Sequence, residues 1–350
     1  MFTGMWAMSV IPGQPGSVRP EEVPEPPESD GSILVDGLLV GICGTDTELI
    51  AGFGQPPPGH QRLVLGHESL GRVVQAPPGA GVVPGDLVAG IVRRPDPVPC
   101  PACASGQWDF CANGRYTERG IKGLDGYGTQ RWRIDPEFVI RLPASLGDCG
   151  VLTEPASVVA KAWEQVERIA TRGPVAGRTA LITGAGPIGL LAALIGVQRG
   201  YQVHVFDQMS DGPKPKLVAG LGATYHHGAI GDIEARPDVV IECTGAGQLV
   251  ADVAGKLAPA GVICLAGLSS GHGMPVDLGA ISTEIVLGNA VIFGTVNAAR
   301  RNYAQAVEAL AKADPDWLAG LLTRRVPLRI WPDALARRPN DVKVTVDLTD

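Results

Sequence analysis

The sequence predicts an α/β protein in which a mostly β domain is joined to a doubly wound parallel-sheet domain. Its 350 residues are enough for two domains that each bury a core. Near residue 155 the sequence changes from Gly- and Pro-rich segments with short β-branched runs to strands that alternate with helices. We therefore assign residues 1–157 and 296–350 to the mostly β domain and residues 158–295 to the parallel-sheet domain.

The first domain is predicted to be an irregular barrel with long loops. Gly and Pro residues punctuate this part of the chain, and the β-branched runs between the turns are typical of short strands. The strands expected here cover residues 32–41, 70–74 and 86–92.

The second domain is predicted to begin with an amphipathic helix over residues 158–172, where apolar residues recur at helical spacing. Continuous apolar runs then indicate strands that are buried on both faces, as in a parallel sheet. These strands cover residues 179–183, 201–207, 238–242, 262–265 and 291–293, and a helix is expected over 188–198. After a helix over 303–312, a last strand over 343–348 is predicted to return to the first domain.

Composition and charge exclude several classes of function. The chain has 45% hydrophobic and 19% charged residues, a net charge of −7 and no Lys- or Arg-rich run, which argues against a nucleic-acid or anionic-membrane partner. The first residues lack a basic stretch followed by a sustained apolar core, so we expect no signal peptide and a cytoplasmic protein. Seven cysteines in such a chain favour metal ligands and buried thiols over disulfides.

A glycine loop in the second domain predicts a dinucleotide site. It follows a buried strand and opens a helix, which is the context that such a loop requires. Gly184 permits the tight turn, Gly186 lets phosphate oxygens approach the backbone, and Gly189 allows close packing of helix and strand. Free amides at the start of the helix favour the pyrophosphate charge. The alternative is a glycine-rich turn that binds no cofactor.

Asp207 extends this prediction to the kind of nicotinamide cofactor. It ends the second strand, 18 residues after Gly189, where a carboxylate accepts hydrogen bonds from the adenosine ribose and repels a 2′-phosphate. NAD is therefore favoured over NADP. Lys214 and Lys216 follow closely and would soften this preference, so NADP stays open.

A second constellation, in the first domain, predicts a metal site. Cys43 is followed 24 residues later by His67 and Glu68, and Glu154 precedes the connecting helix. A thiolate, an imidazole and a carboxylate hold zinc while leaving a position open for substrate. Each residue alone is typical of a buried or surface side chain. Their coincidence with the glycine loop favours hydride transfer with a metal that polarises the substrate oxygen.

A further cysteine cluster follows in the same domain. Cys100, Cys103 and Cys111 have the spacing of a structural zinc site, although a closed site needs four ligands. Asp96 or Asp109 is the predicted fourth ligand. The alternative is a metal-free lobe with three reduced thiols.

The remaining candidates are assigned to structure. Cys149, Cys243 and Cys264 lie among apolar or strand residues and are expected to be core thiols. His226 and His227 are adjacent and not spaced for chelation from one face, so we predict a surface loop pair.

The chain resembles the zinc-dependent medium-chain dehydrogenases over essentially its whole length. This resemblance rests on residues 43–46 (CGTD), 66–73 (GHESLGRV), the cysteine lobe and the glycine loop 184–189. Finer features resemble the glucose dehydrogenase branch of that family, namely residues 113–123, 125–128, Glu154-Pro155 with Val158-Val159, and 294–297 (GTVN).

The resemblance implies a GroES-like catalytic domain that carries both chain ends and a Rossmann domain between them. It implies a catalytic zinc held by Cys43 and His67, with Glu68 and Glu154 sharing the remaining positions. Thr45 matches the hydroxyl relay of the family, and Asp46 matches the carboxylate behind the metal-binding histidine. These assignments give a catalytic set of Thr45, Asp46, Glu68 and Glu154.

The resemblance also implies binding residues and an assembly. Sugar hydroxyls would be contacted by Thr45, Glu118, Glu154 and Asn302. The cofactor would be contacted by Gly184, Gly186, Pro187, Ile188, Gly189, Asp207, Thr244, Val296 and Asn297. Pro97 occupies the place where the family usually has the first cysteine of the lobe. Relatives form dimers or tetramers, so a homodimer or homotetramer is expected.

The predicted function is a zinc-dependent NAD(P) oxidoreductase that oxidises a sugar-like hydroxyl of a small-molecule substrate. By resemblance the first choice is an aldose such as glucose, oxidised at C1 to the lactone. The alternatives are a polyol, amino-cyclitol or secondary-alcohol dehydrogenase on the same scaffold, a zinc-free quinone-type reductase, and a cofactor-binding protein that is not an enzyme.

Overall fold

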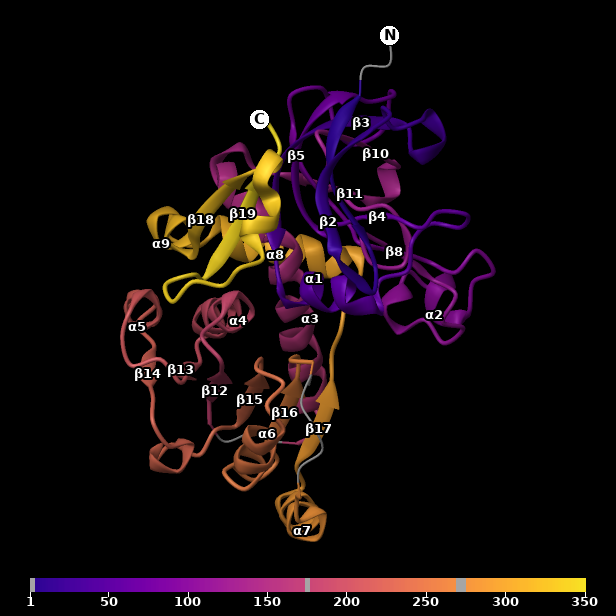
Figure 1. Ribbon diagram of the computed structural model, residues 1–350. Coiled ribbons are helices and arrows are strands. Elements are labelled where there is room, and N and C mark those ends of the chain that lie inside the picture. The colour runs from indigo at the N-terminus through magenta and orange to yellow at the C-terminus, as the bar shows by residue number, and fades with distance from the viewer. Residues whose placement is uncertain (1–3, 174–176, 269–274) are drawn as a thin grey trace. The chain divides into compact units, whose positions relative to one another are not determined.

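The computed structural model describes residues 4–173, 177–268 and 275–350. The chain divides into two compact units (Figure 1). The β-rich unit contains Met1–Ser157 and Asn297–Asp350, and the parallel-sheet unit contains Val158–Val296. Within the described residues, every helix is too short or too polar to cross a membrane.

The β-rich unit is built around a seven-stranded sheet. Its strands follow the order β11-β6-β5-β3-β19-β18, and β10 pairs with β3. The bounds are β3 Ile33–Ile42, β5 Glu68–Gln75, β6 Leu87–Gly90, β10 Arg131–Ile134, β11 Val139–Leu142, β18 Leu322–Pro327 and β19 Lys343–Asp347. The last strand, β19, runs antiparallel to β3 and parallel to β18. Strands from the first and the last part of the chain therefore belong to one sheet.

Smaller elements surround this sheet. One three-stranded sheet contains β1 Met5–Ile11, β2 Gln14–Val23 and β4 Leu63–Val64, and another contains β7 Arg93–Arg94, β8 Thr117–Arg119 and β9 Gly123–Leu124. The helices of the unit are α1 Gly44–Glu48, α2 Pro101–Ala104, α8 Arg300–Ala311 and α9 Pro315–Leu321. Shorter helical turns are η1 Glu28–Asp30, η2 Leu49–Phe53, η3 Trp108–Phe110, η4 Pro136–Phe138, η5 Ala144–Leu152 and η7 Leu328–Ala334.

The connecting helix α3, Thr153–Ala170, begins earlier than the predicted start at residue 158. The prediction was late because the apolar periodicity becomes visible only after the first turn. Glu154 therefore lies in the first helical turn, where a carboxylate interacts favourably with the helix dipole.

The parallel-sheet unit contains a six-stranded parallel sheet in the order β14-β13-β12-β15-β16-β17. Its strands are β12 Thr179–Thr183, β13 Gln202–Phe206, β14 Thr224–His226, β15 Val239–Glu242, β16 Val262–Leu265 and β17 Val291–Gly294. Its remaining helices are α4 Pro187–Gln198, α5 Pro213–Gly220, α6 Gly247–Ala254 and α7 Leu278–Gly288, with the turn η6 Ile230–Asp232. The strand order reverses beside β12, which is where an open α/β sheet of this kind binds ligands.

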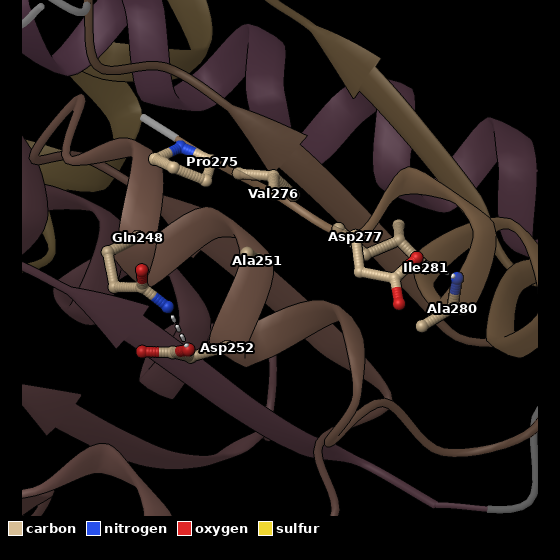
Figure 2. Close-up of a pocket in the computed structure, with 8 residues that line it drawn as sticks. All are labelled: Gln248, Ala251, Asp252, Pro275, Val276, Asp277, Ala280 and Ile281. Atoms are coloured by element: carbon tan, nitrogen blue, oxygen red, sulfur yellow. Dashed lines mark hydrogen bonds between the residues drawn. The ribbon is translucent and has the colours of Figure 1, made fainter. Parts of the chain in front are cut away.

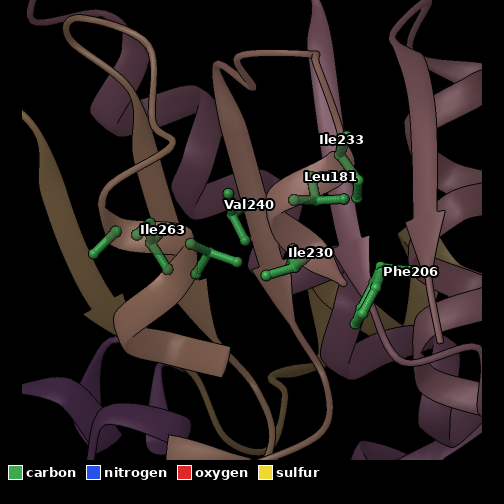
Figure 3. Packing of buried hydrophobic residues seen from close by; sticks show 8 residues of the cluster. Leu181, Phe206, Ile230, Ile233, Val240 and Ile263 are labelled. Atoms are coloured by element: carbon green, nitrogen blue, oxygen red, sulfur yellow. The ribbon is translucent and has the colours of Figure 1, made fainter. Parts of the chain in front are cut away.

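Helices cover both faces of this sheet. On one face, Leu181, Val240 and Ile263 from three adjacent strands pack with Ile230 and Ile233 (Figure 3). On the other face α4 contacts β12 and β13. Helix α3 packs on α4, because the Trp163 ring Nε1 donates to the Ala192 carbonyl at 3.0 Å. The predicted fold class is confirmed by this arrangement.

Candidate active site

Two neighbouring strands of the β-rich unit bring the predicted metal ligands together. Cys43 directly follows β3 and Glu68 opens β5, and these strands pair with Gly41 opposite Glu68. A ligand atom from each of Cys43, His67 and Glu68 lies within 4.8 Å of the other two. The Cys43 Sγ and the His67 Nε2 are 3.0 Å apart. Sheet register therefore explains how residues distant in sequence converge.

Asp46 stands behind the histidine, as the resemblance implies. Its Oδ2 accepts a hydrogen bond from the Cys43 backbone N–H at 2.9 Å, and its Oδ1 lies 3.6 Å from the His67 Nδ1. Burial raises the pKa of Asp46. Burial would lower the pKa of His67, but the negative charges of Cys43 and Asp46 outweigh it and raise that pKa well above its usual value. The Asp46 carboxylate lies on the Nδ1 side of the ring, and Nε2 faces the thiol.

The donors in this cluster fit zinc. They are sulfur, imidazole nitrogen and carboxylate oxygen, and zinc accepts all three types. The Nε2 and Sγ atoms face each other across a gap that a proton bridges and that zinc can occupy in its place. His67 is nearly buried and its Nδ1 accepts or donates no hydrogen bond among the described residues; the Asp46 Oδ1, 3.6 Å away, is the charged atom that faces it.

Glu154 lies beside this cluster without belonging to it. Its carboxylate is not among the ligand atoms that lie within 4.8 Å of one another. Burial raises the pKa of Glu154 to about 7, and the charges of His67 and Glu68 also act on it. Glu154 as a zinc ligand stays a prediction.

Lys343 is a member of the site that the sequence analysis missed. The side chain is 1% exposed, and its Nζ forms an ion pair with the Glu68 Oε2 and donates to the Ile42 carbonyl at 3.1 Å. Burial would lower the pKa of Lys343, but the charges of Glu68 and Cys43 raise it. The lysine thus balances a buried carboxylate. No motif marks it, because it lies in the last strand of the chain.

Thr45 is half-buried in α1, beside Cys43. Within the described part of the chain its hydroxyl makes no hydrogen bond, so it is free to bond a ligand.

Two further predicted contacts meet each other. Glu118 in β8 is nearly buried, and its Oε1 accepts a hydrogen bond from the Asn297 Nδ2 at 2.7 Å. Asn297, predicted to contact the cofactor, has a positive φ of 60°. Asn302 is fully buried in the first turn of α8, and its Oδ1 accepts from the Ala299 backbone N–H at 3.2 Å. The contacts of Asn302 are those of a helix cap, and its sugar contact stays a prediction.

The cysteine lobe gathers three thiols. The sulfurs of Cys100, Cys103 and Cys111 lie within 4.8 Å of one another. The backbone N–H groups of Cys103 and Ala112 lower the pKa of the Cys100 thiol to about 6, whereas burial raises that of Cys103 to about 11. These thiols fit three positions of a zinc site.

No fourth ligand joins the thiols among the residues that the structure describes. The cluster contains neither Asp96 nor Asp109, the two predicted candidates. The Asp96 carboxylate instead accepts from the Arg115 Nε at 3.2 Å and from the Val98 backbone N–H at 2.8 Å. Asp96 and Asp109 as the fourth ligand stay predictions.

The glycine loop has the geometry of a dinucleotide cradle. Gly184 has a φ of 86°, which L side chains rarely adopt, and it packs against Thr244. A Cβ on Gly186 would meet no protein atom within 4 Å, so the space beside the backbone is open. A Cβ on Gly189 would collide with the Gly184 carbonyl oxygen. Pro187 and Ile188 begin α4, so the helix amides start at this open space.

Asp207 is held at this loop by several donors. Its Oδ2 accepts from the Ala185 backbone N–H at 2.7 Å, and the Lys214 Nζ lies 3.1 and 2.9 Å from its two oxygens. Partial burial would raise the pKa of Asp207, but Lys214 and the backbone donors lower it. The negative charge expected to repel a 2′-phosphate therefore has a cation beside it.

The last predicted contact, Val296, is 55% exposed and its carbonyl accepts from the Lys161 Nζ at 3.0 Å.

The two histidines predicted as a surface loop pair are separated by the structure. His226 ends β14, and its Nε2 lies 2.8 Å from the Nδ1 of His204 in β13. Only His227 is exposed. The prediction for His226 was wrong because β14 is too short to show a strand pattern.

A hollow in the parallel-sheet unit, lined by α6 and residues 275–281, contains none of the predicted site residues (Figure 2). At its edge the Gln248 Nε2 donates to the Asp252 Oδ1 at 2.7 Å. No metal-ligand cluster of the described residues falls here, so we assign the chemistry to the residues above.

Comparison with known proteins decides the family. The alcohol dehydrogenase GroES-like domain model matches residues 29–144, and the glucose dehydrogenase C-terminus model matches residues 147–348. The glucose 1-dehydrogenase 2 of Vulcanisaeta moutnovskia is 38% identical over 98% of this chain and 99% of its own length. The chain belongs to the glucose dehydrogenase branch of the zinc-dependent medium-chain dehydrogenases.

Other members of the branch agree with this placement. The glucose 1-dehydrogenase of Thermoproteus tenax is 39% identical over 98% of this chain and 99% of its own. The crystal structure of glucose dehydrogenase from Haloferax mediterranei has a TM-score of 0.89 and 31% identity, covering 98% of this chain and 99% of that one. The same enzyme has been solved in complex with NADP, Zn and gluconolactone.

Proposed function

We propose that this protein is a zinc-dependent NAD(P) dehydrogenase that oxidises an aldose, glucose first, at C1 to the lactone. The observation that carries the proposal is the convergence of Cys43, His67 and Glu68 ligand atoms within 4.8 Å in a chain of the glucose dehydrogenase branch. Relatives that match over the full length are glucose 1-dehydrogenases, and the Haloferax mediterranei enzyme has been solved in complex with NADP, Zn and gluconolactone.

Cys43 and His67 would hold the metal, and Asp46 would fix the orientation of the imidazole. Zinc bound there would polarise the C1 oxygen of the sugar and ease loss of its hydroxyl proton. The nicotinamide of NAD or NADP would accept the hydride from C1. In the balanced reaction, C1 gives up a hydride and its hydroxyl gives up a proton, which leaves the lactone.

The proton needs acceptors in this nearly buried site. The Thr45 hydroxyl has no hydrogen bond within the described residues and is half-buried, so it can accept the substrate proton and pass its own proton towards solvent. Glu154 lies close enough to His67 and Glu68 for their charges to act on it, so its carboxylate can assist the transfer as a further base. We assign Thr45 the first transfer and Glu154 a supporting role.

Cofactor choice is proposed to be dual. Asp207 favours NAD by its charge, and Lys214 offsets that charge at 2.9 Å. We also propose a homodimeric or homotetrameric assembly and a cytoplasmic location. The assembly rests on the family resemblance, and the location is supported by seven cysteines that are all free.

An NAD(P)H-formation screen over aldoses, polyols and cyclitols tests the proposal, with both cofactors compared side by side. We expect turnover of glucose with release of gluconolactone, and activity with each cofactor. Turnover of a polyol or cyclitol without turnover of any aldose would contradict the substrate assignment.

Light scattering on the same preparation measures the assembly, and a monomer would contradict the proposed homodimer or homotetramer.

A further inference from the structure

Arg93 and Glu118 form a buried ion pair that no sequence motif predicts. They occupy directly opposite positions of the paired strands β7 and β8. Arg93 is 5% exposed and Glu118 is 8% exposed. Two opposite charges so deep in a protein are tolerated only when they satisfy each other.

The guanidinium is itself held rigidly. Its NH1 donates to the Asp109 carbonyl at 3.2 Å, and its Cζ lies over the Tyr116 ring, 3.8 Å from the ring centre. Asp109 belongs to the turn η3, just before Cys111 of the cysteine lobe. A planar arginine that is fixed on two sides can impose one orientation on a carboxylate.

The donors around Glu118 all act on one of its oxygens. Arg93 reaches Oε1 through Nε and NH2, each at 3.0 Å, and Asn297 reaches the same atom at 2.7 Å. Within the described part of the chain, the Glu118 Oε2 accepts no hydrogen bond. This oxygen also keeps some exposed surface. Oε2 is therefore the acceptor left for a ligand.

We propose that Arg93 is a positioning residue for the sugar, because it fixes Glu118 so that Oε2 accepts a hydrogen bond from a substrate hydroxyl. This inference rests on the proposed function and on the sugar contact of Glu118 that the family resemblance implies. Arg93 touches neither the metal ligands nor the sugar in this account. Its role is to hold the acceptor oxygen in one orientation before substrate arrives, which lowers the cost of ordering it on binding.

Steady-state kinetics of the zinc-loaded enzyme with glucose test the proposal. For Arg93→Met we expect the glucose KM to rise about tenfold or more, because hydrogen bonds to charged groups carry that much discrimination. Cofactor affinity, measured by NAD(P)H fluorescence, should not change. Arg93→Lys should recover part of the loss, since lysine keeps the charge but not the planar fork.

A double-mutant cycle separates positioning from a general structural effect. In a Glu118→Gln background, Arg93→Met should add less than a twofold further change in glucose KM, because the two residues act as one unit. Arg94→Met is the matched control. Arg94 is the next residue, bonds the Ile91 carbonyl and the Tyr127 hydroxyl, and does not contact Glu118. This control should leave the glucose KM within about twofold of the unmodified enzyme.

Failure of the positioning role and failure of the proposed function give different results. If the unmodified enzyme oxidises no aldose, the proposed function fails. If it oxidises glucose but Arg93→Met leaves KM unchanged, or adds its full effect in the Glu118→Gln background, the positioning role is wrong. Should Arg93→Met not fold, Arg93→Lys and Arg93→Gln carry the same comparison.

Discussion

Buried charges decide what individual residues do in the β-rich unit. Lys343 pairs with Glu68 beside the metal ligands, and Arg93 pairs with Glu118. Each pair removes two charges from water and returns part of that cost by mutual attraction. Such a pair stabilises little as a whole, but losing one partner leaves an uncompensated charge inside the protein.

Replacing Lys343 by Met should therefore lower the free energy of unfolding by about 3–5 kcal/mol. Chemical unfolding of the zinc-loaded protein measures this. Lys216→Met, at an exposed position of α5, is the control and should change the value by less than about 0.5 kcal/mol. Adding Glu68→Gln to the Lys343→Met variant should restore part of the loss. Equal stability of Lys343→Met and the unmodified protein would show that the buried pair is not needed.

Lys214 should set the balance between the two cofactors. Its Nζ lies 2.9 Å from the Asp207 Oδ2, and without it the carboxylate would repel a 2′-phosphate fully. We expect Lys214→Met to raise the ratio of kcat/KM for NAD over NADP roughly tenfold, the effect of about one charged hydrogen bond. Lys216→Met serves again as control. An unchanged ratio would mean that Asp207 does not face the ribose.

At the scale of elements, the turn between β12 and α4 combines two different demands on glycine. Gly189 is needed for the fold, because a side chain there would strike the Gly184 carbonyl. Gly186 is needed only if a ligand approaches, because a side chain there meets no protein atom within 4 Å. The two positions therefore separate stability from binding.

Gly186→Ala should keep the Tm of the protein and weaken cofactor binding at least tenfold, because the added methyl occupies the space of the phosphates. Gly189→Ala should lower the Tm even in the absence of cofactor. Thermal unfolding and NAD(P)H fluorescence titration measure both variants. Unchanged cofactor affinity in Gly186→Ala would contradict the assignment of the loop.

The edge strand β14 and its neighbour β13 should respond to acid through their histidine pair. Burial lowers the pKa of His204, and burial and the charge of His204 lower that of His226. The unfolded imidazoles bind protons near pH 6.5, before the folded ones do. Protons therefore favour the unfolded chain, so the stability is complete above about pH 6.5 and falls as the pH drops towards the lowered folded pKa.

Substituting His226 by Gln should remove part of this loss. Between pH 7.5 and 5.5 the Tm of the variant should fall less than that of the unmodified protein. His227→Gln, at the exposed neighbouring position, is the control and should follow the unmodified protein. Parallel pH curves for all three proteins would rule out the pair as the source of acid sensitivity.

At the scale of the whole molecule, the sequence predicts buried regular structure well and polar edges poorly. The strands at Thr179–Thr183 and Val262–Leu265 agree with their predicted ranges, because continuous apolar runs between turns mark them. The strand β2, Gln14–Val23, was missed because none of its residues is buried and it contains Pro and Glu in place of alternating apolar residues. Its structure comes from pairing with β1, which local patterns do not show.

The same distinction holds for the site. Short motifs were enough to predict that Cys43, His67 and Glu68 converge, since each motif places its ligand at a strand end. Lys343 and Arg93 were not predicted, because their partners are set by sheet register between distant segments. From the sequence alone, a lysine in a terminal strand is expected to face solvent.

The central claim is that a metal held by Cys43 carries sugar oxidation, and one paired measurement on Cys43→Ser tests it most directly. Zinc content and glucose-dependent NAD(P)H formation are measured on the same preparation, with Cys149→Ser, a free cysteine outside the site, as control. We predict that Cys43→Ser loses bound zinc and at least a hundredfold of kcat/KM, whereas Cys149→Ser keeps both. Full turnover by Cys43→Ser without zinc would contradict the account.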